Sequence, residues 1–207
     1  MFVQVIVGRT SDAQAVHHQL EVWEHDLMPG AVGYLGSTGG CVSSGECILV
    51  ARFESAQTAR ENSLRPEQGS WWQRTEGLFD GPVIFHDTED VEVMEHGDLD
   101  SSRFVQVMQG RVADRKRAGE LHREADAMLG EIRPDLLGTV TVYVDDGGFF
   151  ELAYFTDEGE ARANESKQPP AGAAEMIAEW ERVMKVDRYL DITEPWLVSA
   201  EPGFAAQ

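Results

Sequence analysis

Two residues in the first half of the chain have side chains suited to acid–base or oxyanion chemistry, Asn62 and His86. Histidine titrates near neutral pH, so His86 can act as a general base toward a phenol or an activated methylene. The amide of Asn62 can hold a phenolate or a reduced-oxygen intermediate by hydrogen bonds. Each residue also has a structural interpretation, because Asn62 can cap a helix C-terminus and His86 can hydrogen-bond Asp87 or solvent at a strand end. Both are candidate catalytic residues, and both alternatives stay open.

Four further residues of the same half could bind a ligand. Trp71 and Trp72 offer rings on which an aromatic molecule would stack. Neighbouring helical residues point about 100° apart, so at most one of the two faces a cavity, and core packing is favoured for Trp72. Arg52 can pair with an anionic substrate or with an acidic neighbour. Gln4 interrupts an apolar strand, so its amide must bond a neighbouring group or face a ligand.

The helix expected over 12–28 carries imidazoles and carboxylates at helical spacing: His17, His18, Glu21, Glu24 and His25. Such groups can bind a divalent metal. No second element supplies further ligands, so a solvated polar face is the favoured interpretation and we expect no metal. The chain also lacks a Gly-rich phosphate loop, a Ser-His-Asp order and a thiol–histidine pair, and we expect no cofactor.

The charge of the chain limits its partners. Its 207 residues carry a formal net charge of −20, which repels nucleic acid and anionic membranes. There is no apolar run long enough for a transmembrane helix, and the N-terminus does not have the pattern of a secretion signal. We therefore expect a cytoplasmic protein that binds neither nucleic acid nor membranes.

Two cysteines, Cys41 and Cys47, flank the turn-like stretch VSSGE. A disulfide between them is one alternative. Free thiols are the favoured one, because the cytoplasm is reducing.

The sequence contains an internal duplication. FVQVIVGR (2–9) returns as FVQVMQGR (104–111), an offset of 102 residues. The same offset aligns LVARFESAQTAREN (49–62) with ELAYFTDEGEARAN (151–164). Two separate blocks at the same offset are not expected by chance, so the chain contains two copies of one structural unit.

Each copy has the element order β-α-β-β-α-β, which is typical of a ferredoxin-like α+β unit. The strands are apolar on both sides, which indicates that both faces of each sheet are covered. We expect the two antiparallel sheets to pack into an α+β barrel closed within one chain, so that a monomer or a weak homo-oligomer suffices. The expected division is a first repeat at 1–88, an acidic linker at 89–102, a second repeat at 103–193 and a C-terminal tail at 194–207.

The element order, the duplication and the passage RFESAQTAREN (52–62) resemble the dimeric α+β barrel superfamily, and within it the antibiotic-biosynthesis-monooxygenase-like domains. The resemblance implies a cofactor-independent monooxygenase acting on an aromatic or polyketide-type small molecule, with the family's pocket asparagine at Asn62. Haem-degrading relatives use a histidine of the roofing helix. The corresponding stretches, 65–81 and 165–185, contain none.

Three functions follow in order of preference. The first is the cofactor-independent monooxygenase, with the first repeat as the working half and an apolar pocket that reaches both Asn62 and His86. The alternative is a small-molecule-binding or structural protein that keeps the fold without catalysis. Haem binding or haem degradation is the third.

Overall fold

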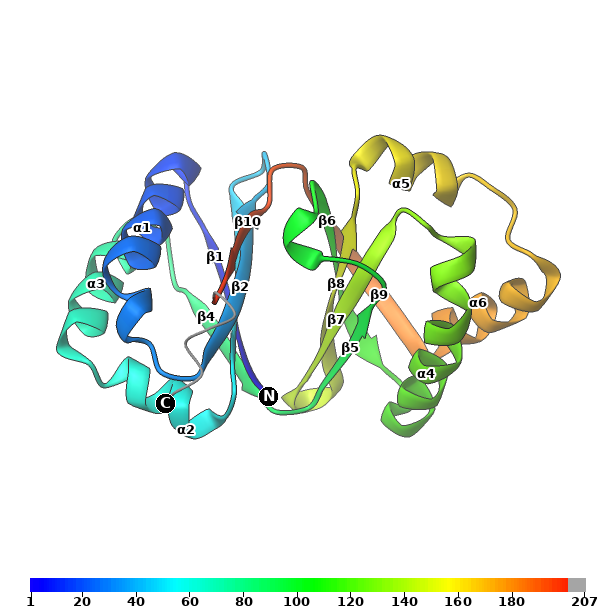
Figure 1. Cartoon of the computed structure of the whole chain (residues 1–207), viewed down its shortest axis with the longest axis horizontal. Coiled ribbons are helices and arrows are strands. Elements are labelled where there is room, and N and C mark those ends of the chain that lie inside the picture. Colours follow the sequence, from blue (N-terminus) through cyan, green and yellow to red (C-terminus); the bar gives the residue numbers. More distant parts are fainter. Residues whose placement is uncertain (201–207) are drawn as a thin grey trace. The chain divides into compact units, whose positions relative to one another are not determined.

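The duplication predicted from the sequence takes the form of two sheets, each built from five antiparallel strands. The computed structural model describes residues 1–200, and the side chains of these except for those at 127, 131 and 171. The chain divides into two units (Figure 1). Unit 1 is Met1–Glu89 together with the chain from Pro195 onward, and unit 2 is Asp90–Glu194.

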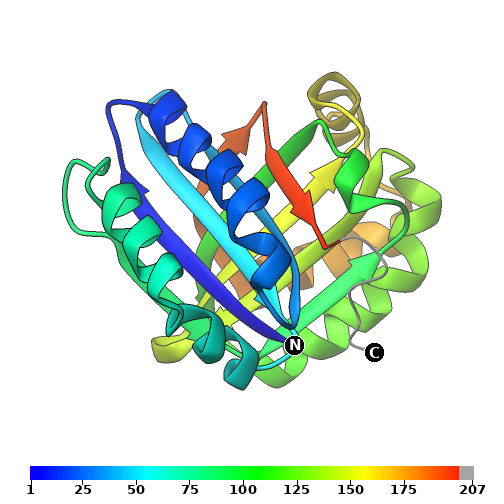
Figure 2. The same cartoon turned by 60° about the vertical axis from the view of Figure 1, so that its left-hand side comes forward.

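The sheet of unit 1 has the strand order β10-β2-β3-β1-β4. Its strands are β1 (Phe2–Arg9), β2 (Tyr34–Cys41), β3 (Glu46–Phe53), β4 (Ile84–Thr88) and β10 (Trp196–Ser199). Its helices are α1 (Ala13–Asp26), α2 (Ala56–Ser63) and α3 (Pro66–Glu76), with a 3₁₀ turn at Met28–Gly30. Both α1 and α3 lie on one face of this sheet (Figure 1), and Figure 2 shows α1 along the strands with β10, in red, beside β2. The four strands of the repeat itself have the ferredoxin-like order.

The core of unit 1 forms where α1 meets the sheet. Trp23 of α1 and Leu27, the residue that caps its C-terminus, are buried, and the partly buried Leu20 packs against them. They contact Tyr34 of β2 and Phe53 of β3 in one apolar cluster. The spacing of these helical residues, three or four apart, places them on one stripe, which is why α1 lies flat on the sheet.

The sheet of unit 2 repeats this arrangement with the order β5-β7-β8-β6-β9. Its strands are β5 (Val91–Glu95), β6 (Phe104–Val112), β7 (Leu136–Val144), β8 (Gly148–Phe155) and β9 (Met184–Ile192). Its helices are α4 (Arg115–Ile132), α5 (Glu158–Glu165) and α6 (Ala171–Val183), with 3₁₀ turns at Leu99–Ser101 and Asp145–Gly147. The predicted α+β class and the two ferredoxin-like repeats are confirmed.

The fifth strand of each sheet comes from outside the predicted repeats. The segment expected as an acidic linker, 89–102, contains β5, which pairs with β7 of unit 2. The segment expected as a C-terminal tail, 194–207, contains β10, which pairs with β2 of unit 1. Both segments therefore have a structural role in a sheet, and unit 1 is built from two separate stretches of the chain.

The expected closure into a barrel is not found. Among the described residues both sheets are open, with β10 and β4 at the edges of one and β5 and β9 at the edges of the other. The reason is that β10 and β5 extend the sheets at their edges and join no strand of one sheet to a strand of the other. Closed hydrogen bonding would have removed these edges.

The two cysteines form a disulfide, Cys41–Cys47, so the expectation of free thiols is wrong. The hairpin of β2 and β3 sets the two residues directly opposite each other, with their Cα atoms 4.0 Å apart. The register of the hairpin thus brings the two side chains within reach of each other. The cytoplasmic location from which free thiols were inferred stays a prediction.

We expect reduction of this disulfide to lower the free energy of unfolding by about 2 kcal/mol, because it closes only a short loop and so restricts the unfolded chain modestly. Urea denaturation with and without reductant measures the change. A Cys41→Ser/Cys47→Ser variant should show the lower stability in both conditions. Equal stability of the oxidised and reduced wild type would contradict the prediction.

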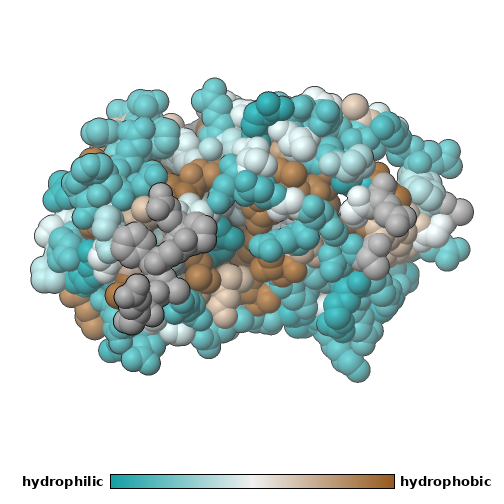
Figure 3. Space-filling view, in the orientation of Figure 1, coloured by the Kyte–Doolittle hydropathy of each residue, from teal (hydrophilic) through white to brown (hydrophobic). Residues whose placement is uncertain are grey.

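No helix in residues 1–200 has the length and apolar character needed to cross a membrane. Hydrophilic side chains predominate on the face seen in Figure 3, in keeping with the large negative charge of the chain.

Candidate functional site

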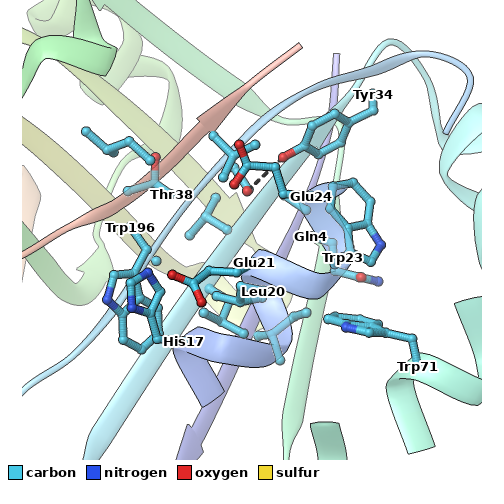
Figure 4. Close-up of a pocket in the computed structure, with 18 of the residues that line it drawn as sticks. Gln4, His17, Leu20, Glu21, Trp23, Glu24, Tyr34, Thr38, Trp71 and Trp196 are labelled. Atoms are coloured by element: carbon cyan, nitrogen blue, oxygen red, sulfur yellow. Dashed lines mark hydrogen bonds between the residues drawn. The ribbon is translucent and has the colours of Figure 1, made fainter. Parts of the chain in front are cut away.

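A cavity of about 150 Å³ lies within unit 1, between its sheet and the helices that cover it. Engineered cavities of similar volume accommodate benzene, so this space suits a molecule with one small ring. The wall combines residues of β1, β2, β3, β10, α1, α2 and α3. The close-up in Figure 4 shows the side chains that converge on it.

Aromatic rings supply much of this wall. Trp23 and Tyr34 meet edge to face with their centroids 4.8 Å apart, and Tyr34 meets Phe53 in the same way at 5.6 Å. Trp71 completes this group, 6.4 Å from Trp23. Trp196 of β10 lies at the other end of the cavity (Figure 4). Such a wall favours a ligand that can stack or make edge contacts with rings.

Hydrogen bonds fix the two indoles. The Nε1–H of Trp23 donates to Oε1 of Gln68 at 2.7 Å, and that of Trp71 donates to the carbonyl oxygen of Gln19 at 2.7 Å. The rings are thereby held in one orientation, and their polar edges are already satisfied. A ligand therefore meets their π-faces and CH edges.

Asn62 lines the cavity from the last turn of α2 and is only 6% exposed. Its Oδ1 accepts a hydrogen bond from Nη1 of Arg65 at 2.8 Å, and the same guanidinium nitrogen donates to the carbonyl oxygen of Leu27. The C-cap of α2 is Leu64 and not Asn62. Unit 2 has the same contact, from Lys167 to Asn164. The pair therefore ties a helix end to the next segment in both repeats, while in unit 1 the amide also reaches the cavity.

Gln4 also lines the cavity, and it too has a counterpart in unit 2. Its Nε2 donates to Oδ1 of Asp87 at 2.9 Å, as Gln106 does to Asp191. In each repeat the amide in the first strand is thus satisfied by a carboxylate of the adjacent closing strand. Gln4 thus bonds a neighbouring group, which was one of its two interpretations, and it also borders the cavity. Its contact with a ligand stays a prediction.

Three other candidate residues, His86, Arg52 and Trp72, are not part of the described cavity wall. On β4, His86 is opposite Val5 of β1, whereas Asp87 is opposite Gln4. Successive strand residues point to opposite faces of a sheet, so His86 is on the face away from the cavity. The expected pocket shared by Asn62 and His86 is therefore not formed.

On β3, Ala51 and Phe53 line the cavity on either side of Arg52. Because side chains alternate along a strand, Arg52 is directed to the opposite face of the sheet. Its Nε is buried without a hydrogen-bond partner among the described residues. Trp72 is half-buried and packs on Phe85, with ring centroids 5.1 Å apart. Neither Arg52 nor Trp72 is among the described residues of the cavity wall.

Several residues of the wall were not expected from the sequence. His17 stacks on Trp196, with ring centroids 4.7 Å apart and planes only 6° from parallel. Glu21 and Glu24 follow one and two turns along α1 and also border the cavity (Figure 4). The sequence favoured a solvated polar face for these three residues, with a metal site as the alternative, and neither interpretation placed them at a cavity. No metal-binding group of three such residues occurs in the part of the chain that the structure describes. The apolar WLVS of β10 was the available signal for Trp196.

Unit 2 differs at the position that corresponds to the cavity floor. Leu49 and Gly39 face each other in unit 1, and Glu151 and Thr141 take these places in unit 2. Glu151 is 8% exposed, and Thr141 donates to its Oε2 at 3.0 Å. Burial raises the pKa of Glu151 to about 7, against the lowering effect of the Thr141 hydrogen bond and with a further rise from Glu92. The two repeats therefore have different interiors on a common frame.

No family model and no curated protein matches the sequence. Solved structures do resemble the chain over nearly its whole length. A candidate monooxygenase from Fusobacterium nucleatum superposes with a TM-score of 0.71 at 8% identity, covering 97% of this chain and 94% of that one. A candidate monooxygenase from Lactobacillus acidophilus gives 0.66 at 11% identity, covering 95% and 92%.

An anthrone oxidase-like protein gives a TM-score of 0.66 at 12% identity, covering 100% of this chain and 96% of that one. At such identities the likeness concerns the fold and not the reaction. The predicted resemblance is confirmed at the level of the fold: the chain has the fold of these monooxygenase-like structures, with two ferredoxin-like units in one polypeptide.

Proposed function

We propose that the protein binds a small aromatic molecule in the cavity of unit 1. The observation that carries this proposal is a concave, ring-lined space whose indoles are fixed by hydrogen bonds to the protein. Concave, mostly apolar spaces with a few placed polar groups are the usual form of small-molecule sites. Unit 2, with Glu151 at the equivalent of the cavity floor, serves mainly as a scaffold in this proposal.

Two neighbouring tryptophans provide the test. Titration of the protein with indole, followed by calorimetry, should show saturable binding. Trp71→Leu should weaken it by about five- to tenfold, because the ligand loses one aromatic neighbour. Trp72→Leu, one residue away and outside the described cavity wall, is the matched control and should leave the affinity unchanged. Absence of binding by the wild type, or equal losses in both variants, would refute the proposal.

The second candidate function is cofactor-independent monooxygenation in the same cavity. It is favoured by the position of Asn62 and by the folds of the proteins described above, which bear the names of monooxygenases and an oxidase. Arg65 occupies Oδ1 of Asn62, so the Nδ2–H group is the part of the amide available to donate to an oxyanion. A hydrogen-bond donor aimed at developing negative charge is a common source of rate enhancement.

Oxygen consumption with a one-ring phenol as substrate, a size that suits the cavity, tests this second function. If the protein is an oxygenase, Asn62→Ala should slow uptake by about a hundredfold, the usual loss for one oxyanion donor. Asn164→Ala removes the equivalent amide of unit 2 and should have no effect. Saturable ligand binding without oxygen uptake would leave the binding function and discard the enzymatic one.

A further inference from the structure

We infer that the molecule bound in unit 1 is an organic cation, with a small ring and a protonated amine. The inference rests on the proposed binding function and adds the chemical class of the ligand. It comes from the electrostatic character of the cavity wall, in which carboxylates stand beside aromatic rings.

Two carboxylates border the cavity, those of Glu21 and Glu24 on α1. They follow His17 on the same side of the helix, because residues three, four and seven apart share a face. In Figure 4 they lie between the His17–Trp196 stack and Tyr34. Among the described residues of the wall there is neither lysine nor arginine. The basic side chain in the described wall is the imidazole of His17, and the imidazole of His18 lies 3.2 Å from Oε2 of Glu21. An anionic ligand would therefore meet two carboxylates with no lysine or arginine of the described wall to offset them.

Arg65, the arginine that hydrogen-bonds the cavity residue Asn62, does not change this balance. Nε of Arg65 pairs with Glu67 at 2.9 Å, and its Nη1 is used by Asn62 and Leu27. Its charge is thus matched by a carboxylate and its donors are directed to protein acceptors. Arg65 is also not part of the described wall.

Several hydrogen-bond donors of the wall are already used within the protein. The indole N–H groups of Trp23 and Trp71 and the amide N–H of Gln4 each have an acceptor, as described above. The two tryptophans therefore present their ring faces to a ligand. Ring faces carry negative electrostatic potential and attract ammonium groups, most strongly on tryptophan. Carboxylates and ring faces together are complementary to a protonated amine.

The net charge of the whole chain also favours a cationic ligand. A formal net charge of −20 raises the local concentration of cations and disfavours the approach of anions. This long-range effect is not selective for the cavity. The selective part must come from Glu21, Glu24 and the rings, which makes it separable by mutation.

Three ligands with the same ring and different charge test the inference: 2-phenylethylammonium, 2-phenylethanol and phenylacetate. Calorimetric titration of the full chain at low ionic strength should give the tightest binding for the ammonium compound, about tenfold tighter than for the alcohol. Phenylacetate should bind weakest. Replacing both carboxylates, Glu21→Gln/Glu24→Gln, should bring the ammonium and alcohol affinities to within about twofold of each other.

A charge-matched variant, Glu61→Gln/Glu76→Gln, removes two exposed carboxylates of unit 1 outside the described wall and should keep the preference for the cation. If the alcohol binds as tightly as the ammonium compound, or phenylacetate binds best, the inference is wrong while the binding function stands. If both double variants lose the preference equally, the cation is attracted by net charge alone and the inference is also wrong. If none of the three ligands binds, the proposed function and the inference both fail.

Discussion

Replacing Glu151 by glutamine is expected to stabilise the protein by about 3 kcal/mol at pH 8 and to change its stability little at pH 5. Burial raises the pKa of this carboxyl from 4.5 to about 7 in the folded chain. The folded state therefore holds a proton that the unfolded state releases. Stability from this group is fully present below pH 4.5, falls as the pH rises and is lost above pH 7. A difference of this size corresponds to about 3 kcal/mol.

Burial sets the upward direction of the pKa shift of Glu151, and its polar neighbours modify the size of the shift. The carboxylate of Glu92 raises the pKa further, although Arg115 at 3.1 Å and the hydroxyl of Tyr143 at 3.1 Å bind it. Thr141 acts in the opposite direction by donating to Glu151. Glutamine keeps the shape and an acceptor for Thr141 but carries no charge, so the variant isolates the cost of ionisation.

Urea denaturation of both proteins between pH 5 and pH 8 measures the effect. Glu175→Gln removes an exposed carboxylate from α6 of the same unit and is the matched control, with the pH dependence of the wild type. Wild-type stability that does not fall between pH 5 and pH 7, or an equal change in the control, would contradict the prediction.

Removal of β10 is expected to have the second large effect, on both stability and ligand binding. A protein that stops after Glu194 lacks β10, and we expect its unit 1 to be less stable by about 3 kcal/mol, because three partly buried apolar residues and a strand pairing are lost. Ligand binding should fall by more than about tenfold, since Trp196, Leu197 and Val198 belong to the cavity wall.

A protein that stops after Ala200 keeps β10 and is the matched control for this truncation. It should retain both stability and ligand affinity. Chemical denaturation reports the stability of the two truncated proteins, and calorimetric titration with indole reports their affinity. Equal behaviour of the two would show that β10 contributes nothing to unit 1.

The repeat frame could be predicted because its signal is long. Two blocks in one register, with alternating strands such as Val3–Gln4–Val5, define the order of elements in both copies. The parity of β1 also places Gln4 on one face and Val5 on the other. The side on which His86 lies depends on the register between β1 and β4, which no local pattern encodes. That register pairs His86 with Val5 and separates it from Asn62.

The other differences between the sequence-based predictions and the structure concern short segments or residues whose state depends on distant parts of the chain. β10 has four residues and β5 has five, too few for a periodic pattern to stand out from a polar segment. The state of Cys41 and Cys47 was inferred from a compartment, whereas the hairpin register decides whether they can meet. Trp71 could be linked to a ligand from its type, but its orientation depends on how α3 rests against α1.

β10 completes the sheet of unit 1 although it follows unit 2 in the sequence, so the order of synthesis affects when unit 1 can fold. Residues 90–194 leave the ribosome as a continuous stretch that contains all five strands of their sheet. Residues 1–89, although made before residues 90–194, lack one strand until translation has passed Ser199. Nascent chains generally fold domain by domain from the N-terminus. Here unit 1 is completed only after all of unit 2 has been made, so its proposed ligand site can form only once β10 has been synthesised.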